Sequence, residues 1–144
     1  MYNKAEKAAL SLISRAEQNS LGLRFKLERK GYDAALIQEV INRLIEKNLL
    51  NDERFAELWI RSCLARKRPS PLWLRVSLEK RGISSELALR AIKKVLDDET
   101  EYALMLEYIE KMDISHGEKP GNLKNQLKFN GFSHEIINKY FDSI

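Results

Sequence analysis

The residue types that most often carry catalysis are scarce in this chain and lie far apart. His116 and His134 are its only histidines, and neither has a metal-ligand spacing to the other or to the single cysteine, Cys63. Cys63 falls on an apolar stripe, which favours a small core residue over a nucleophile. The acidic run 97–101 is typical of a solvated helix start, and no glycine-rich loop is placed to cradle a phosphate. We therefore predict that the protein is not an enzyme, with no catalytic residue, no metal and no cofactor.

Basic side chains in the middle third of the chain are the stronger signal. The net charge of +4 is uneven, since residues 51–96 hold 11 basic and 5 acidic side chains, whereas residues 97–144 hold 5 and 10. A basic centre beside an acidic end predicts a polyanion or an acidic protein as the partner of the middle. The candidate binding residues are all the basic side chains of that segment: Arg54, Arg61, Arg66, Lys67, Arg68, Arg75, Lys80, Arg81, Arg90, Lys93 and Lys94.

Some of these cations have spacings that would gather them on one surface. Arg54, Arg61 and Arg68 recur every seven residues, so they would share a helix face if one helix extended that far. Residues 66–68 and Arg75 bracket the start of the next helix, where free backbone N–H groups already favour anions. The alternative is a surface ion-pair ladder of little energetic weight, because Glu57 is three residues after Arg54 and four before Arg61.

Both tryptophans of the chain lie in the same basic segment. Trp59 belongs to an apolar stripe whose spacing predicts the inner face of a helix. The members of that stripe are Phe55, Leu58, Trp59, Ser62 and Cys63. We interpret Trp73, which precedes Leu74 of the next helix, as a core residue packed between helices, with an exposed contact anchor as the alternative.

The elements that must position these side chains are written three times in the sequence. Each copy has two leucines four apart, a glycine four residues after the second, and then a large apolar residue. The copies are Leu23, Leu27, Gly31 and Tyr32; Leu74, Leu78, Gly82 and Ile83; and Leu123, Leu127, Gly131 and Phe132. Leucines at this spacing share a helix face, and a glycine one turn later suits the left-handed residue that closes a helix. The next apolar residue should then fold back onto the second leucine.

The spacing of the three glycines, 51 and then 49 residues, indicates tandem supersecondary units. Apolar spacings predict a further helix on each side of every glycine motif, and no stretch alternates with a period of two. We therefore predict an all-α fold of three tandem three-helix repeats, at residues 1–50, 51–98 and 99–144. In the third unit we expect Tyr102, Leu106 and Ile109 in the core and the longest loop at residues 113–122.

The bulk composition bounds the location of the protein. No apolar run approaches the ~20 residues that span a bilayer, and the N-terminus has no signal-peptide pattern. A single cysteine cannot form an internal disulfide, which agrees with a reducing compartment. We therefore predict a cytoplasmic protein with no membrane partner.

Three segments of the middle unit carry a family resemblance: Asn51-Asp-Glu-Arg-Phe-Ala-Glu57, then Trp59-Ile-Arg61-Ser62, then Leu78-Glu-Lys-Arg-Gly82-Ile83. Together they resemble the core of the RecX family of bacterial regulatory proteins. The first unit is similar to the family in Leu27-x-x-Lys30-Gly31-Tyr32 and in Leu44-x-x-x-x-Leu49-Leu50-Asn51-Asp52. The resemblance covers about residues 5–96, is specific at residues 52–83, and is weaker from residue 97 onward. Pro69-Ser70-Pro71 stands where the family more often has a glycine-containing basic loop.

The resemblance implies an elongated, curved array of three-helix repeats that regulates without catalysis, in DNA recombination, DNA repair and the SOS response. Its implied partner is the RecA recombinase filament on single-stranded DNA, whose recombination and ATPase activities it would inhibit or modulate as a monomer. Duplex DNA would be a weaker ligand. By position, Arg54, Arg61, Arg75 and Arg81 correspond to recurrent basic positions of the family.

Two other functions are compatible with the residues alone. The chain could be a helical DNA-binding protein without a recombinase target, because helix pairs joined by short glycine turns resemble helix-turn-helix units. It could also be a helical scaffold for some other protein, which would show no salt-dependent DNA binding.

Overall fold

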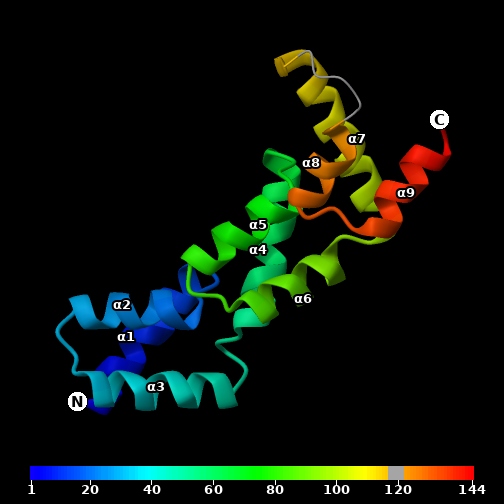
Figure 1. Cartoon of the computed structure of the whole chain (residues 1–144). Helices are drawn as coiled ribbons and strands as arrows, with labels where there is room; N and C mark the ends of the chain where they lie inside the picture. The colour runs from blue at the N-terminus through cyan, green and yellow to red at the C-terminus, as the bar shows by residue number, and fades with distance from the viewer. Residues whose placement is uncertain (117–121) are drawn as a thin grey trace.

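The computed structural model describes residues 1–116 and 122–144, and all regular structure within them is helical. The helices of these residues are α1 (Tyr2–Arg15), α2 (Ser20–Arg29), α3 (Ala34–Glu46), α4 (Asp52–Arg66), α5 (Pro71–Lys80), α6 (Ser85–Val95), α7 (Asp98–His116), α8 (Leu123–Phe129) and α9 (His134–Asp142). The predicted all-α fold is confirmed. Three successive helix trios form an elongated array, with the two chain termini at opposite ends (Figure 1). None of the described helices is both long and apolar enough to span a bilayer.

Each trio ends its second helix with the glycine turn that the sequence predicts. Gly31, Gly82 and Gly131 have φ angles of 96°, 90° and 89°, in the left-handed region that a residue without a Cβ adopts at little cost. The residue after each glycine donates its N–H to the carbonyl of the second leucine of the motif. These bonds join Tyr32 to Leu27 at 3.3 Å, Ile83 to Leu78 at 3.1 Å, and Phe132 to Leu127 at 3.2 Å. This hydrogen bond defines the Schellman helix end and confirms the predicted fold-back.

Short polar linkers set where the helices begin. Asn19, Asp33, Asn51, Ser70 and Ser84 each accept, through a side-chain oxygen, the backbone N–H of the residue three positions later. Such a cap satisfies one of the free N–H groups of the first turn, and its loss typically costs about 1 kcal/mol. The linkers therefore fix the starts of five helices, including both helices that carry tryptophan.

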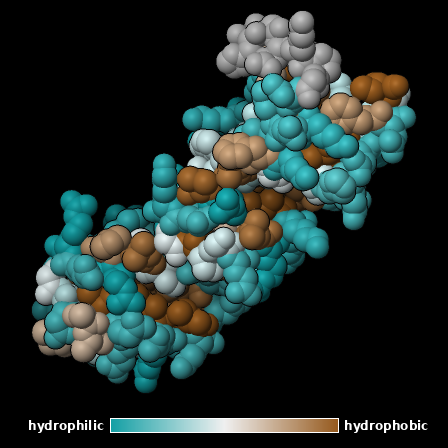
Figure 2. Space-filling view, in the orientation of Figure 1, coloured by the Kyte–Doolittle hydropathy of each residue, from teal (hydrophilic) through white to brown (hydrophobic). Residues whose placement is uncertain are grey.

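The buried side chains form two hydrophobic cores. The first lies within the first trio and runs from Ala5 on α1 to Leu50 just after α3. The second is continuous through the later two trios, from Ala56 on α4 to Ile137 on α9. The face of the molecule in Figure 2 is mostly hydrophilic, with smaller hydrophobic patches along the array. The second and third trios are thus held together by a shared core.

The glycine turn of one repeat packs on the preceding repeat in both junctions. A Cβ built on Gly82 would lie 2.6 Å from Cβ of Leu21, and one built on Gly131 would lie 3.0 Å from the backbone nitrogen of Leu72. Leu21 and Leu72 occupy the same repeat position, ten residues before their own glycines. Gly31, which has no earlier repeat to meet, has no such neighbour within 4 Å. At both junctions the glycine turn therefore packs near the equivalent position of the preceding repeat, on the Leu21 side chain in one case and on the Leu72 backbone in the other.

A charged pair also crosses each junction. Glu17 accepts from Nε of Arg54 at 2.8 Å between the first and second repeats, and Glu107 accepts from Nε of Arg68 at 2.8 Å between the second and third. Glu17 and Arg68 hold the same repeat position, fourteen residues before their glycines. The sign of the pair is reversed between the two junctions, so each junction has its own charge arrangement.

Three sequence-based expectations are corrected by the packing. Leu58 is 49% exposed and Ser62 is exposed as well, because α4 turns Ala56, Ile60 and Cys63 toward the core. Small Ala56 on α4 and the small alanines on α6 are buried in the same core and suit a close contact between these two helices. Leu106 is 40% exposed, and Leu104 and Met105 take its expected place in the core.

The expected loop at residues 113–122 is shorter than predicted at its start. Residues 113–116 continue α7 as far as His116, and residue 122 precedes α8 directly. Residues 117–121 of the expected loop lie outside the described residues.

Candidate nucleic-acid interface

Every one of the eleven candidate basic residues lies at the surface. Eight are exposed, and Arg54, Arg68 and Arg75 are half-buried. No member is sealed inside the array, so all remain available for contacts with solvent, with neighbouring side chains or with a partner. Their intramolecular contacts separate them into two groups.

Five of the eleven are engaged in ion pairs within the chain. Besides the junction pairs of Arg54 and Arg68, Arg75 bonds to Glu79 at 2.8 Å, and Arg90 and Lys94 pair with acidic side chains at 3.7 and 3.3 Å. The partner of Lys94 is Glu57. The alternative of an ion-pair ladder through Arg54, Glu57 and Arg61 is therefore excluded, because Glu57 pairs with Lys94 of α6 instead of the two arginines. These exposed pairs each add only ~0–1 kcal/mol to stability.

The seven-residue row of arginines is also broken. α4 ends at Arg66, two residues before Arg68, because the segment Pro69-Ser70-Pro71 disfavours a helical backbone before each proline. Arg68 has a positive φ of 52° and turns toward the third repeat. Arg61 follows Trp59 by two positions, which rotates it by about 200° around the helix axis. It therefore lies on the opposite side of α4 from the tryptophan.

A continuous row of stacked side chains joins α4 to α5, and we call it the cation–aromatic row. Its members are Lys67, Trp73, Trp59 and Arg81, each in contact with the next. Nζ of Lys67 lies 5.9 Å from the ring centroid of Trp73, the two indole rings stack with centroids 5.8 Å apart at 13°, and Cζ of Arg81 lies 4.7 Å from the Trp59 ring. The geometry is that of offset aromatic stacking with cation–π contacts at both ends.

Local sequence explains why the row forms. Trp73, Ser77 and Arg81 follow one another at intervals of four on α5 and its C-cap, so they lie along one helix face. Arg81 also donates to the carbonyl of Ser77 at 3.0 Å, which fixes its guanidinium along that face. The N-cap bond from the N–H of Trp73 to the hydroxyl of Ser70 sets the start of the helix. Trp59, from α4, packs against this stripe.

Positive charge is concentrated around the row. Burial raises the pKa of the Cys63 thiol, and the nearby charges of Arg66, Arg81 and Lys67 lower it in part. Three cations therefore lie close enough to act on one buried group. Lys80 is exposed and lies seven residues after Trp73, two helical turns along nearly the same face of α5. We define the basic face as Arg66, Lys67, Lys80 and Arg81. Within the described part of the chain, none of these four forms an ion pair.

The aromatic part of this surface is what sequence reasoning missed. Trp73 is 41% exposed, so its interpretation as a core residue is wrong, whereas Trp59 is partly buried against the second core. The signal that could have revealed the row is the spacing of Trp73 and Arg81, which places a ring and a cation two turns apart on one helix face. Sequence alone could not show that Trp59 of another helix stacks on that ring.

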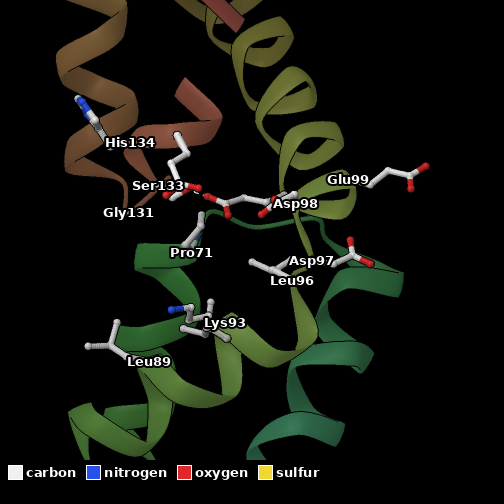
Figure 3. A pocket seen from close by; sticks show the side chains of 13 residues that line it. Pro71, Leu89, Lys93, Leu96, Asp97, Asp98, Glu99, Gly131, Ser133 and His134 are labelled. Atoms are coloured by element: carbon white, nitrogen blue, oxygen red, sulfur yellow. Dashed lines mark hydrogen bonds between the residues drawn. The ribbon is translucent and has the colours of Figure 1, made fainter. Parts of the chain in front are cut away.

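A second surface, of opposite charge, lies where the second and third repeats meet. It is an open groove of about 970 Å³ between α6, the start of α7 and the start of α9 (Figure 3). Leu89 and Lys93 line one side and Asp97, Asp98 and Glu99 another. Within the third repeat, Glu101 accepts the backbone N–H of Ser133 at 2.6 Å, which joins the start of α7 to the start of α9. Lys93 thus belongs to this groove and not to the basic face.

The carboxylates of the groove also complement their helix. The first turn of α7 contains Asp98, Glu99 and Glu101, whose negative charges interact favourably with the positive end of the helix dipole. Among the described residues, no group of three histidine, cysteine or acidic side chains is arranged to hold a metal ion.

Comparisons with known proteins identify the family of the three-helix units. Residues 5–44 match the first three-helix domain of RecX, and residues 51–92 match its second three-helix domain. The regulatory protein RecX of Treponema pallidum (strain Nichols) is 29% identical over 136 residues, covering 94% of this chain and 82% of that protein. The RecX of Syntrophotalea carbinolica is 28% identical over 143 residues, covering 95% and 94%.

Solved structures have the same arrangement along the whole chain. The crystal structure of RecX from Lactobacillus salivarius matches with a TM-score of 0.77 and 25% identity, over 99% of this chain and 95% of that one. A second RecX crystal structure matches in fold with a TM-score of 0.76 at 18% identity, over 98% and 73%. The two domain matches, the relatives and the shared fold lead to one conclusion: the chain belongs to the RecX family of regulatory proteins.

Proposed function

We propose that this chain binds the filament that the RecA recombinase forms on single-stranded DNA and restrains its recombination and ATPase activities. The observation that carries the proposal is the family match, which extends over nearly the whole chain. The proposed setting is recombinational DNA repair in the cytoplasm, with the protein acting as a monomer. Duplex DNA would be a weaker ligand.

The basic face is the proposed contact with the filament. Its four cations have no ion-pair partner among the described residues, so they can meet DNA phosphates or carboxylates of the recombinase without first breaking an ion pair. We expect a smaller contribution to this contact from the five cations that already form ion pairs within the chain, namely Arg54, Arg68, Arg75, Arg90 and Lys94. An elongated repeat array suits a filament, since it presents a long surface that is ordered before binding.

The test is inhibition of DNA-dependent ATP hydrolysis and of strand exchange by the recombinase. The parent protein should inhibit both reactions, and a variant with Arg66, Lys67, Lys80 and Arg81 changed to Gln should inhibit them more weakly. A single Arg61→Gln variant is the control, because Arg61 is exposed on the opposite side of α4. No inhibition by the parent would reject the function, and equal potency of the basic-face variant would reject the contact surface.

The second candidate is a helical DNA-binding protein without a recombinase target. The observation that favours it is the cation–aromatic row, whose chemistry suits nucleic acid directly. Tight binding to bare DNA, with no additional affinity for the recombinase filament and no inhibition of ATP hydrolysis, would decide for this candidate.

A further inference from the structure

The cation–aromatic row contains both tryptophans of the chain and has one ring partly open to solvent. Trp73 is 41% exposed, while its partner Trp59 is held against the second core. The rings are nearly parallel, at 13°, so a third planar group can continue the stack on Trp73. The stack therefore offers a flat apolar surface between positive charges.

We propose that the row is a binding site for an unpaired base of single-stranded DNA, which stacks on Trp73 while the neighbouring phosphates meet Lys67, Arg66 and Arg81. This inference deepens the proposed function, because it assigns this site to the DNA of the filament and not to the recombinase. Each nucleotide brings a π-face and a negative charge together, and the row presents the complement of both. An acidic protein surface would use the cations and leave the Trp73 ring without a partner.

Lys67 is the side chain that a base would replace. Its Nζ lies 5.9 Å from the Trp73 centroid, at the outer limit of a cation–π contact, and the side chain is exposed. A phosphate beside the ring would attract this ammonium group and leave the ring face to the base. Arg81, at 4.7 Å from Trp59 and bonded to the carbonyl of Ser77, is held more firmly and would stay in place.

Duplex DNA is disfavoured at this site for a geometric reason. A paired base is already stacked on both faces, so it can reach Trp73 only after it is extracted from the duplex, which costs a few kcal/mol by general experience with base flipping. The row should therefore select single strands over duplexes even though phosphates are present in both.

Tryptophan fluorescence tests the proposal directly, because every tryptophan in the chain belongs to the row. The intact protein is titrated with oligothymidylate and, separately, with an abasic oligomer of the same length. Oligothymidylate should quench the emission and bind more tightly, and the abasic oligomer should leave the emission nearly unchanged. Equal quenching and equal affinity for the two oligomers would overturn base stacking and leave only phosphate binding.

Variants separate the ring from the charges. Trp73→Ala should weaken oligothymidylate binding by about 5- to 150-fold, the range for the loss of one base–aromatic stack, and leave abasic binding unchanged. Trp73→Phe should restore part of the affinity, which a loss through misfolding would not explain. Lys67→Ala should reduce the salt dependence by about 0.7 in the slope of log K against log salt, the value for one phosphate of a single strand. Phe129→Ala, at a 76% exposed ring of the third repeat, is the matched control and should have no effect.

The proposed function and this inference fail in different ways. Base-dependent quenching without inhibition of the recombinase would support the base-binding site and reject the proposed function. If oligothymidylate causes no quenching while Trp73→Ala abolishes inhibition of the recombinase, the row contacts the protein of the filament, and the inference is overturned.

Discussion

Replacement of Gly82 by alanine tests how the repeats are joined. Gly82 has a φ of 90°, and an added Cβ would lie 2.6 Å from Cβ of Leu21 on the preceding repeat. A contact to a Cβ atom cannot be relieved by a side-chain rotation alone, so the two repeats must separate or shift. Gly31 provides an internal control, because its φ is 96° and its added Cβ would meet nothing within 4 Å.

The magnitudes follow from these two geometries. Both substitutions place a Cβ in the left-handed region, which costs roughly 1–2 kcal/mol. Only Gly82→Ala adds overpacking against a neighbour, which typically costs a further ~1–3 kcal/mol. The free energy of unfolding should therefore fall by about 1–2 kcal/mol for Gly31→Ala and by about 2–5 kcal/mol for Gly82→Ala.

The assay is urea unfolding followed by helical circular dichroism, with Gly31→Ala, Gly82→Ala and Leu21→Ala as single variants and Leu21→Ala combined with each glycine variant in turn. Leu21→Ala removes the Cδ and Cγ atoms that crowd the new Cβ, so it should recover part of the extra loss when it is combined with Gly82→Ala. The signature is a coupling between the two positions that Leu21→Ala does not show with Gly31→Ala. Equal destabilisation by Gly31→Ala and Gly82→Ala would refute the stacking of the glycine turn on the earlier repeat.

Three further predictions concern stability. Ser70→Ala should lower the free energy of unfolding by about 1 kcal/mol because it removes a buried cap of α5, and Ser84→Ala at an exposed cap should cost less; urea unfolding of both decides. Arg68→Glu should destabilise by repulsion from Glu107, and the exchanged pair Arg68→Glu with Glu107→Arg should recover the loss; no recovery would mean that the pair does not couple the repeats. Burial raises the pKa of Cys63 above its ordinary 9.0, so the folded state keeps the thiol neutral at pH values where the unfolded state ionises it. This contribution to stability is fully present below pH 9.0 and is lost as pH rises from 9.0 through the folded-state pKa. The parent should therefore lose more stability above pH 9.0 than Cys63→Ala, and equal losses would contradict this assignment.

The helix ends of this protein were predictable because they are local. A left-handed glycine, a following apolar residue and a polar cap act within about one helical turn, so Gly82, Ile83 and Ser84 specify their own backbone. Three copies of the same local signal then fix the fold class, because each unit repeats the same alternation of cap, helix and stop.

Side-chain partners were harder to predict because they depend on other helices. The spacing allowed Glu57 to pair with Arg54 and Arg61 on its own helix, but it pairs with Lys94 of α6 instead. Arg68 would have shared a helix face with Arg54 and Arg61 only if α4 extended that far, but α4 ends at Arg66 and Arg68 pairs with Glu107. A spacing rule describes one helix at a time, so it carries no information on which neighbour lies across a junction.

The aromatic row illustrates the same limit. The burial of Trp73 depends on whether another element covers it, and only the packing of α4 against α5 shows that Trp59 covers one side of the ring. Composition placed the excess of positive charge in the middle repeat. The structure was needed to select the four cations of the basic face from the eleven candidates.

The most direct test of the account is the affinity of charge-matched variants for the recombinase filament on single-stranded DNA, measured over a range of salt concentrations. One variant changes Arg66, Lys67, Lys80 and Arg81 of the basic face to Gln. The other removes the same charge from exposed residues of the first repeat, Lys4, Lys7, Arg29 and Lys30.

The account predicts that the first-repeat variant binds nearly as tightly as the parent and keeps its salt dependence. The basic-face variant should lose at least about tenfold in affinity, because loss of a single contact worth roughly 1.4 kcal/mol already has that effect. It should also bind with a shallower dependence on salt. Equal affinities of the two variants at every salt concentration would contradict the claim that the basic face of the second repeat meets the filament.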